Sequence, residues 1–210
     1  MEEPADNPER DPHVAQQNAK ANFDRLVVGV PKDIQNRESQ AADTIARLSG
    51  SAIKKLRALH QEMTIISAAI APFVACKQGC TACCHYTVHL YPIEAELIEK
   101  RTQYQRLPQQ APEADFHGTP CPFLTNGRCG IYEDRPMTCR QHFALTNTAY
   151  WCDPVRSGSI QLAMAQLSMI QVAFQQIIEK DGRTGYLDIR QVFGTNPRFP
   201  EPPLLGLGPA

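Results

Sequence analysis

Eight cysteines lie between residues 76 and 152 of this 210-residue chain, and they constrain its fold more than any other feature. Four belong to the segment Cys76-Lys-Gln-Gly-Cys80-Thr-Ala-Cys83-Cys84, and four more follow after a gap of 36 residues. Tight turns can aim sulfurs separated by two or three residues at one ion, as in zinc and iron–sulfur sites. We therefore predict that the metal ligands are Cys76, Cys80, Cys83, Cys84, Cys121, Cys129, Cys139 and Cys152.

The first residues bear on the redox compartment that these cysteines meet. They have no basic start and no apolar core, so they resemble neither a secretory signal nor a transit peptide, and we expect a cytoplasmic location. Cysteines in the cytoplasm are rarely paired in disulfides. Eight thiols without a partner would be exposed to oxidation, which favours bound metal.

Composition narrows the range of partners. The formal net charge is -1 and apolar residues make up 42% of the chain, so no nucleic-acid-binding polycation is indicated. The most apolar stretch, residues 63–75, contains Pro72 and is shorter than the roughly 20 residues that a membrane span needs. We expect a metal ion as partner, no nucleic acid and no membrane span, and a protein partner stays open.

Apolar spacing predicts three helices. Residues 43–70 carry apolar side chains at alternating intervals of three and four, which indicates one long helix between Asp43 and Pro72. A second helix is expected to begin at Pro92, a favoured first helical position, and to end before Pro108. A third should follow the last cysteine, with Ser157 or Ser159 as its cap and Gly182 just past its end.

These patterns predict a mainly α fold, in which a small irregular cysteine-rich metal-binding core is flanked by long amphipathic helices. The expected divisions are a disordered tail at 1–22, an N-terminal segment and long helix at 23–75, the cysteine cluster at 76–152, a C-terminal helical region packing on it at 153–195, and a flexible tail at 196–210. Within the second division, residues 23–31 are a β-branched run that suits a strand or an extended segment.

The adjacent pair Cys83 and Cys84 limits how the sulfurs are shared. Consecutive side chains diverge on both helices and strands, so the two either serve different metal centres or include one packed or reactive thiol. Eight thiolates would fill two four-thiolate sites and leave a negative excess. Cations near the cysteines in sequence can balance it, namely Lys77, Arg128, Arg135 and Arg140.

Histidines lie close to the cysteines as well. His85, His89 and His142 could each replace a thiolate, because imidazole also binds zinc. With eight thiols present, we expect hydrogen-bonding roles for them instead. We assign no role to His60, expected on a helix surface, or to His117, in the loop before Cys121.

The segments CKQGCTACC and CPFLTNGRCGIYEDRPMTCR, with Glu94 between them, resemble the YkgJ-type cysteine-cluster family. That family is described as a zinc- or iron-chelating domain with eight cysteines. Seven cysteines match its pattern, and Cys152 completes the count. The flagellin lysine methylases are similar, more distantly, and their cluster is thought to hold an iron–sulfur centre.

Three functions are consistent with these features, and whether the chain is an enzyme stays open. The first is a zinc-stabilised binding or interaction module. The second is an iron–sulfur protein with a redox or modification role, which the C-x3-C-x2-C spacing of Cys76, Cys80 and Cys83 favours and for which a 4Fe–4S cluster is one candidate cofactor. The third is storage, sensing or delivery of metal. Too few residues follow Cys84 for the barrel of a radical enzyme.

Overall fold

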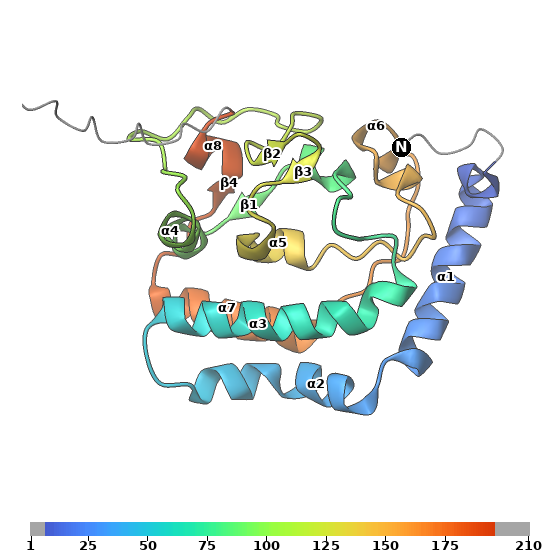
Figure 1. The fold of residues 1–210 in the computed structure, drawn as a ribbon, viewed down its shortest axis with the longest axis horizontal. Helices are drawn as coiled ribbons and strands as arrows, with labels where there is room; N and C mark the ends of the chain where they lie inside the picture. Colours follow the sequence, from blue (N-terminus) through green and yellow to red (C-terminus); the bar gives the residue numbers. More distant parts are fainter. Residues whose placement is uncertain (1–6, 196–210) are drawn as a thin grey trace, which may run out of the picture.

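The computed structural model describes residues 7–195, and within them the chain is mainly helical. Three helices form a layer in which each packs on the other two: α2 (Lys32–Arg47), α3 (Ala52–Ile70) and α7 (Ser168–Asp181). The cysteine-rich region lies over this layer, and α1 (Pro12–Gly29) runs along one side of the molecule (Figure 1). The predicted mainly α fold with a cysteine-rich region is confirmed.

The other elements hold the cysteine-rich region together. They are the 3-10 helices η1 (Pro8–Arg10), η2 (Ala71–Phe73), η3 (Ala82–His85), η4 (Tyr132–Asp134) and η5 (Tyr150–Cys152), the α-helices α4 (Pro92–Arg101), α5 (Met137–Arg140), α6 (Pro154–Ser157) and α8 (Ile189–Phe193), and the strands β1 (His89–Leu90), β2 (Leu124–Thr125), β3 (Arg128–Cys129) and β4 (Leu187–Asp188). Strand β1 pairs antiparallel with β4, and β2 with β3.

The helical layer buries the apolar stripe that the sequence shows. Each fully buried Leu, Ile or Met side chain contributes roughly 1.5–3 kcal/mol to folding. The layer's fully buried side chains include Ile45, Leu56, Leu59, Met63, Ile66, Ile170 and Ile177. None of the cysteines belongs to this core, and the cysteine-rich region packs on it through Met137, Phe143 and Leu145.

The prediction of one long helix over residues 43–70 is wrong, because the chain folds back between α2 and α3. Gly50 has a φ of 120°, which L side chains rarely adopt, and the Ser51 hydroxyl caps α3 by accepting from the Lys54 amide. The buried Lys55 ammonium donates to the carbonyls of Ile45, at 2.8 Å, and Ala46. The apolar spacing continues across this turn, so spacing alone could not reveal it.

The N-terminal prediction is also corrected. Helix α1 occupies residues predicted as disordered tail and as an extended run, with Asp11 capping it and Pro12 in its first turn. Small residues on one face, Ala15 and Ala19, are fully buried, so the helix lies close to its neighbours. Residues 1–6 and the predicted tail at 196–210 lie outside the described residues.

The other two predicted helices are both present, but only one of them begins at the predicted residue. Helix α4 begins at Pro92 as expected, and Glu94 accepts from the Tyr91 amide at 2.9 Å. Helix α7 begins at Ser168 rather than at Ser157 or Ser159, because the intervening chain is extended and bridges Ala144 through Met164. Across residues 7–195, no helix is both long and apolar enough to cross a membrane.

Gly182 ends α7 in the left-handed conformation, with φ at 78°. A Cβ at Gly182 or at Gly185 would meet no atom within 4 Å, and only Gly182 has a positive φ. We expect Gly182→Ala to lower the free energy of unfolding by about 1 kcal/mol and Gly185→Ala to leave it unchanged. Urea unfolding of both variants measures this, and equal stabilities would contradict the role of Gly182 as the helix stop.

Candidate metal centre

Two loops bring the first six cysteines together, and helix α5 carries the seventh, Cys139. After η2 the chain turns at Gly79, with φ at 91°, between Cys76 and Cys80, and then enters η3. The hairpin of β2 and β3 turns at Asn126 and Gly127, both with positive φ. The Cys121 amide donates to the Cys84 carbonyl at 2.7 Å, which ties the second loop to the first. The turn signals at Gly79 and Asn126-Gly127 are the local reason for this meeting.

Five cysteines line one cavity of about 440 Å³. They are Cys76, Cys80, Cys83, Cys139 and Cys152. The cavity lies between the C-terminal half of α3, the loop before η3 and the segment from η4 to α5. Three cationic side chains, those of Lys77, Arg135 and Arg140, also line it. Cys84, Cys121 and Cys129 are not part of this lining.

Burial raises the pKa of most of the eight cysteine thiols in the absence of metal. It raises the pKa of Cys76 and of Cys121 to about 11 and that of Cys152 to about 12, and it raises the pKa of Cys139 well above the usual value. The pKa of Cys83 is raised by its hydrogen bond with Cys84 first and by burial second. A bound metal would therefore release protons as it converts thiols to thiolates.

Hydrogen-bond donors partly offset that burial. The Ala144 amide donates to the Cys76 sulfur at 3.3 Å, and the Cys76 thiol faces the His142 carbonyl at 3.1 Å. Backbone bonds from Phe123 and Ile131, two residues after their cysteines, lower the pKa of Cys121 and Cys129. Amides that donate to sulfur are a common feature of thiolate metal sites, so the donor set fits a metal.

Arg135 is the cation that acts on most of the thiols. Its charge lowers the pKa of Cys76, Cys83, Cys129 and Cys139. The guanidinium lies 3.6 Å from the centroid of the Tyr132 ring, and its Nε donates to the Tyr132 carbonyl at 2.9 Å. Stacking and hydrogen bonding together hold the charge at the cavity wall. Of the four cations predicted to balance thiolates, Arg135 is therefore the best placed.

The cysteines form two sets, according to which thiolates repel one another. The neighbours that raise the pKa of Cys152 are first Cys76, then Cys80 and Cys83. Those that raise the pKa of Cys139 are Cys83, Cys121 and Cys129. Cys83 belongs to both lists, so it lies where the two sets meet. Cys152 thus joins the first set across the long sequence gap.

Within residues 7–195, no three side chains of His, Cys, Asp or Glu converge on a point as ligands of one ion. Four sulfurs at about 2.3 Å from a zinc ion lie within about 4 Å of one another. The eight cysteines, all in the described part of the chain, are free thiols rather than disulfides.

The histidines occupy the margins of the site. His142 lines the cavity and burial lowers its pKa, while the His85 ring lies 3.3 Å from the Thr81 carbonyl and His89 is exposed. His60 corrects the prediction of a surface position, since only 7% of it is exposed. Burial, together with the charges of Arg140 and Arg135, lowers the pKa of His60 to about 3. His60 is therefore neutral at neutral pH.

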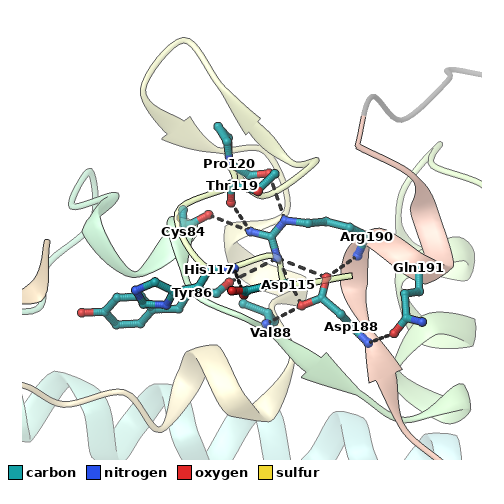
Figure 2. A network of polar contacts seen from close by, with 10 residues as sticks. All are labelled: Cys84, Tyr86, Val88, Asp115, His117, Thr119, Pro120, Asp188, Arg190 and Gln191. Carbon is teal, nitrogen blue, oxygen red and sulfur yellow. Dashed lines mark hydrogen bonds and ion pairs between the residues drawn. The ribbon is translucent and has the colours of Figure 1, made fainter. Parts of the chain in front are cut away.

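A buried arginine outside the cysteine segment fastens the two loops, and no local sequence pattern points to it. Arg190 is fully buried and donates to the carbonyls of Cys84, Tyr86, Thr119 and Pro120 (Figure 2). Its charge is paired with Asp188 at 3.1 Å, and Asp188 in turn accepts from the Val88 amide at 2.7 Å. The C-terminal segment thus fixes the backbone at Cys84 and next to Cys121.

Comparison with known families agrees with this chemistry. Residues 75–155 match the family model CxxCxxCC, which is described as a "Putative zinc- or iron-chelating domain". The match confirms the predicted resemblance to a cysteine-cluster family with this description. No curated protein and no solved structure shows a significant match to the chain.

Removal of Arg190 should destabilise the fold strongly. Arg190→Ala would leave the Asp188 carboxylate, which is 3% exposed, without its cation, and the carbonyls of Tyr86, Thr119 and Pro120 without this donor, while the Cys84 carbonyl would keep the Cys121 amide. We expect a loss of about 3–5 kcal/mol in the free energy of unfolding. The control is Arg183→Ala, which removes exposed ion pairs and should cost less than about 1 kcal/mol. Similar losses for the two variants, measured by urea unfolding, would argue against the Arg190 fastening.

Proposed function

Because residues 75–155 carry the zinc- or iron-chelating CxxCxxCC domain, we propose that this chain is an iron–sulfur protein whose cluster is held by Cys76, Cys80, Cys83 and Cys152. The single observation that carries the proposal is the cavity of about 440 Å³ lined by these thiols and Cys139. A single tetrahedral ion needs four sulfurs within about 4 Å of one another. A cluster interposes iron and sulfide between the ligand sulfurs, and it suits a wider cavity.

The choice of four ligands follows from mutual proximity. Cys152 interacts electrostatically with Cys76, Cys80 and Cys83, and all four line the same cavity. Cys76, Cys80 and Cys83 supply the C-x3-C-x2-C spacing, and Cys152 supplies a fourth sulfur from a distant segment. Cys139, whose neighbours include Cys121 and Cys129, would belong with Cys84 to the second set.

Charge and hydrogen bonding in the cavity suit a cluster held by thiolates. Such clusters carry net negative charge, and the guanidinium of Arg135 opposes it from the wall. The Ala144 amide would donate to the ligand sulfur of Cys76. When bound, an iron–sulfur cluster supplies one-electron transfer at a potential that burial and hydrogen bonds to its sulfurs determine.

A zinc-stabilised interaction module is the competing function. The backbone donors from Phe123 and Ile131 to Cys121 and Cys129 favour it, because amides two residues after a cysteine recur in thiolate sites for single ions. These two cysteines do not line the cavity, so this observation bears on the second set of thiols. Metal content separates the two functions.

Purification without oxygen should give a brown protein. We expect about four iron and about four acid-labile sulfides per chain, together with broad visible absorbance from sulfur-to-iron charge transfer. Metal analysis, a sulfide assay and the visible spectrum measure these quantities on one sample. A colourless protein with about two zinc ions per chain, the number that eight thiolates can hold, would support the zinc module and exclude the cluster.

Single substitutions test which thiols hold the cluster. Cys80→Ala and Cys152→Ala should each abolish the visible absorbance and release the iron, because each removes one of four ligands. Cys129→Ala is the matched control, since it removes a partly buried thiol outside the cavity lining and should retain the chromophore. A bleached Cys129→Ala protein beside a brown Cys152→Ala protein would contradict the assignment.

A further inference from the structure

A second, smaller cavity of about 220 Å³ lies beside the cavity lined by cysteines. Helices α3 and α4 contribute Arg57, His60 and Arg101 to it, and the segment around η4 and α5 contributes Glu133, Asp134 and Arg140. Thr64, Glu133 and Arg140 line both cavities, so they form a common wall. No feature of the metal-binding proposal uses this second space.

Arg140 is a buried cation that makes no ion pair within 4 Å among residues 7–195. Only 6% of it is exposed, and its guanidinium donates to the carbonyls of Arg135, at 2.9 Å, and Glu133. A guanidinium is charged at neutral pH. Buried charges are normally paired, because removing an ion from water is costly. The charges of Glu133, Asp134 and Glu94 act on Arg140 from a distance, but no carboxylate contacts its guanidinium in the described part of the chain.

Two further groups in the same cavity have unused capacity for hydrogen bonds. The His60 Nε2 atom is buried and has no partner within the described range. Arg57, one helical turn before His60, is exposed and makes no ion pair with any residue between 7 and 195. A neutral imidazole can donate through Nε2, and a guanidinium can donate to two oxygens at once.

The charges that face the cavity leave a positive excess. Arg101 is paired with Asp134 at 3.1 Å, so these two cancel. The carboxylate of Glu133 opposes the remaining cations, Arg57 and Arg140. The cavity lining therefore holds three cations and two carboxylates. Outside the lining, the Glu94 carboxylate acts on Arg140 and the Arg135 guanidinium acts on both Arg140 and His60, so one positive charge is left for a ligand to neutralise. The Thr64 hydroxyl already donates its proton to the His60 carbonyl at 3.0 Å, so it has no proton left for a ligand.

We propose that this cavity binds a small oxyanion of the phosphate class. Its oxygens would accept hydrogen bonds from Arg57 at the mouth, from Arg140 on the wall shared with the metal cavity, and from His60 Nε2. Several donors around one space suit a tetrahedral anion better than a flat one. The ligand would lie next to the metal centre without being bonded to it.

The test is calorimetric titration of the metal-loaded protein with inorganic phosphate at constant ionic strength. Saturable binding is expected, and Arg57→Gln should weaken it about tenfold, the effect of losing one charged hydrogen-bond donor. Lys54→Gln is the matched control, because it removes an exposed cation from the same helix outside the cavity and should leave the affinity unchanged. Absence of saturable binding, or equal losses in the two variants, would overturn the proposal.

Two further arms identify the ligand chemistry and the site. Sulfate should bind with an affinity near that of phosphate and acetate more weakly, whereas tighter binding of acetate would overturn the assignment to the phosphate class.

The nitrogen NMR signals of the His60 ring should shift during the phosphate titration, while those of the exposed His13 ring stay fixed. An unchanged His60 signal at saturation would exclude this cavity as the site. The visible spectrum of the metal should not change, which separates this binding from anion binding at the metal.

Discussion

Removal of cysteine thiols from water is the constraint on which the rest of this structure depends. Burial is the leading cause of the raised pKa of Cys76, Cys121, Cys129, Cys139 and Cys152. Backbone donors and Arg135 offset only part of this effect. A cationic metal is the group that can reverse it, because it favours thiolate far more strongly than a hydrogen bond does. The free energy of metal binding is thus coupled to the local structure of the two cysteine loops.

That local structure depends on segments outside the part of the chain that matches the family. Helix α3 provides one wall of the cavity, and Arg190 of α8 fastens the backbone at Cys84 and beside Cys121. At the other end, the buried Glu9 carboxylate accepts from the amides of Asn147 and Thr148, and the Trp151 ring donates to the Glu9 carbonyl. These contacts set the position of Cys152. The two cysteine loops and the segment that carries Cys152 are therefore held by distant parts of the chain.

Sequence alone predicted features that have a local cause. Pro92 starts α4, Gly182 ends α7, and the cysteine spacing identifies the chelating segment, since each depends on neighbouring residues. The break at Gly50 was missed because the apolar stripe on either side keeps its register. Arg190 was missed because its hydrogen-bond partners lie up to 106 positions away in the sequence. His60 was missed because it is buried by the packing of the cysteine region on α3.

Arg140 lines both cavities, so its charge acts on the thiols in one and on the proposed anion in the other. Arg135 lowers the pKa of four thiols, whereas Arg140 lowers the pKa of Cys129 and interacts with Cys139. An anion against Arg140 would still reduce the positive potential on the cysteine side of the wall. Thiolates, and the metal they hold, would then be slightly less favoured. By linkage, metal-bound thiolates would weaken the anion to the same extent, which couples the two proposed sites negatively through one buried side chain.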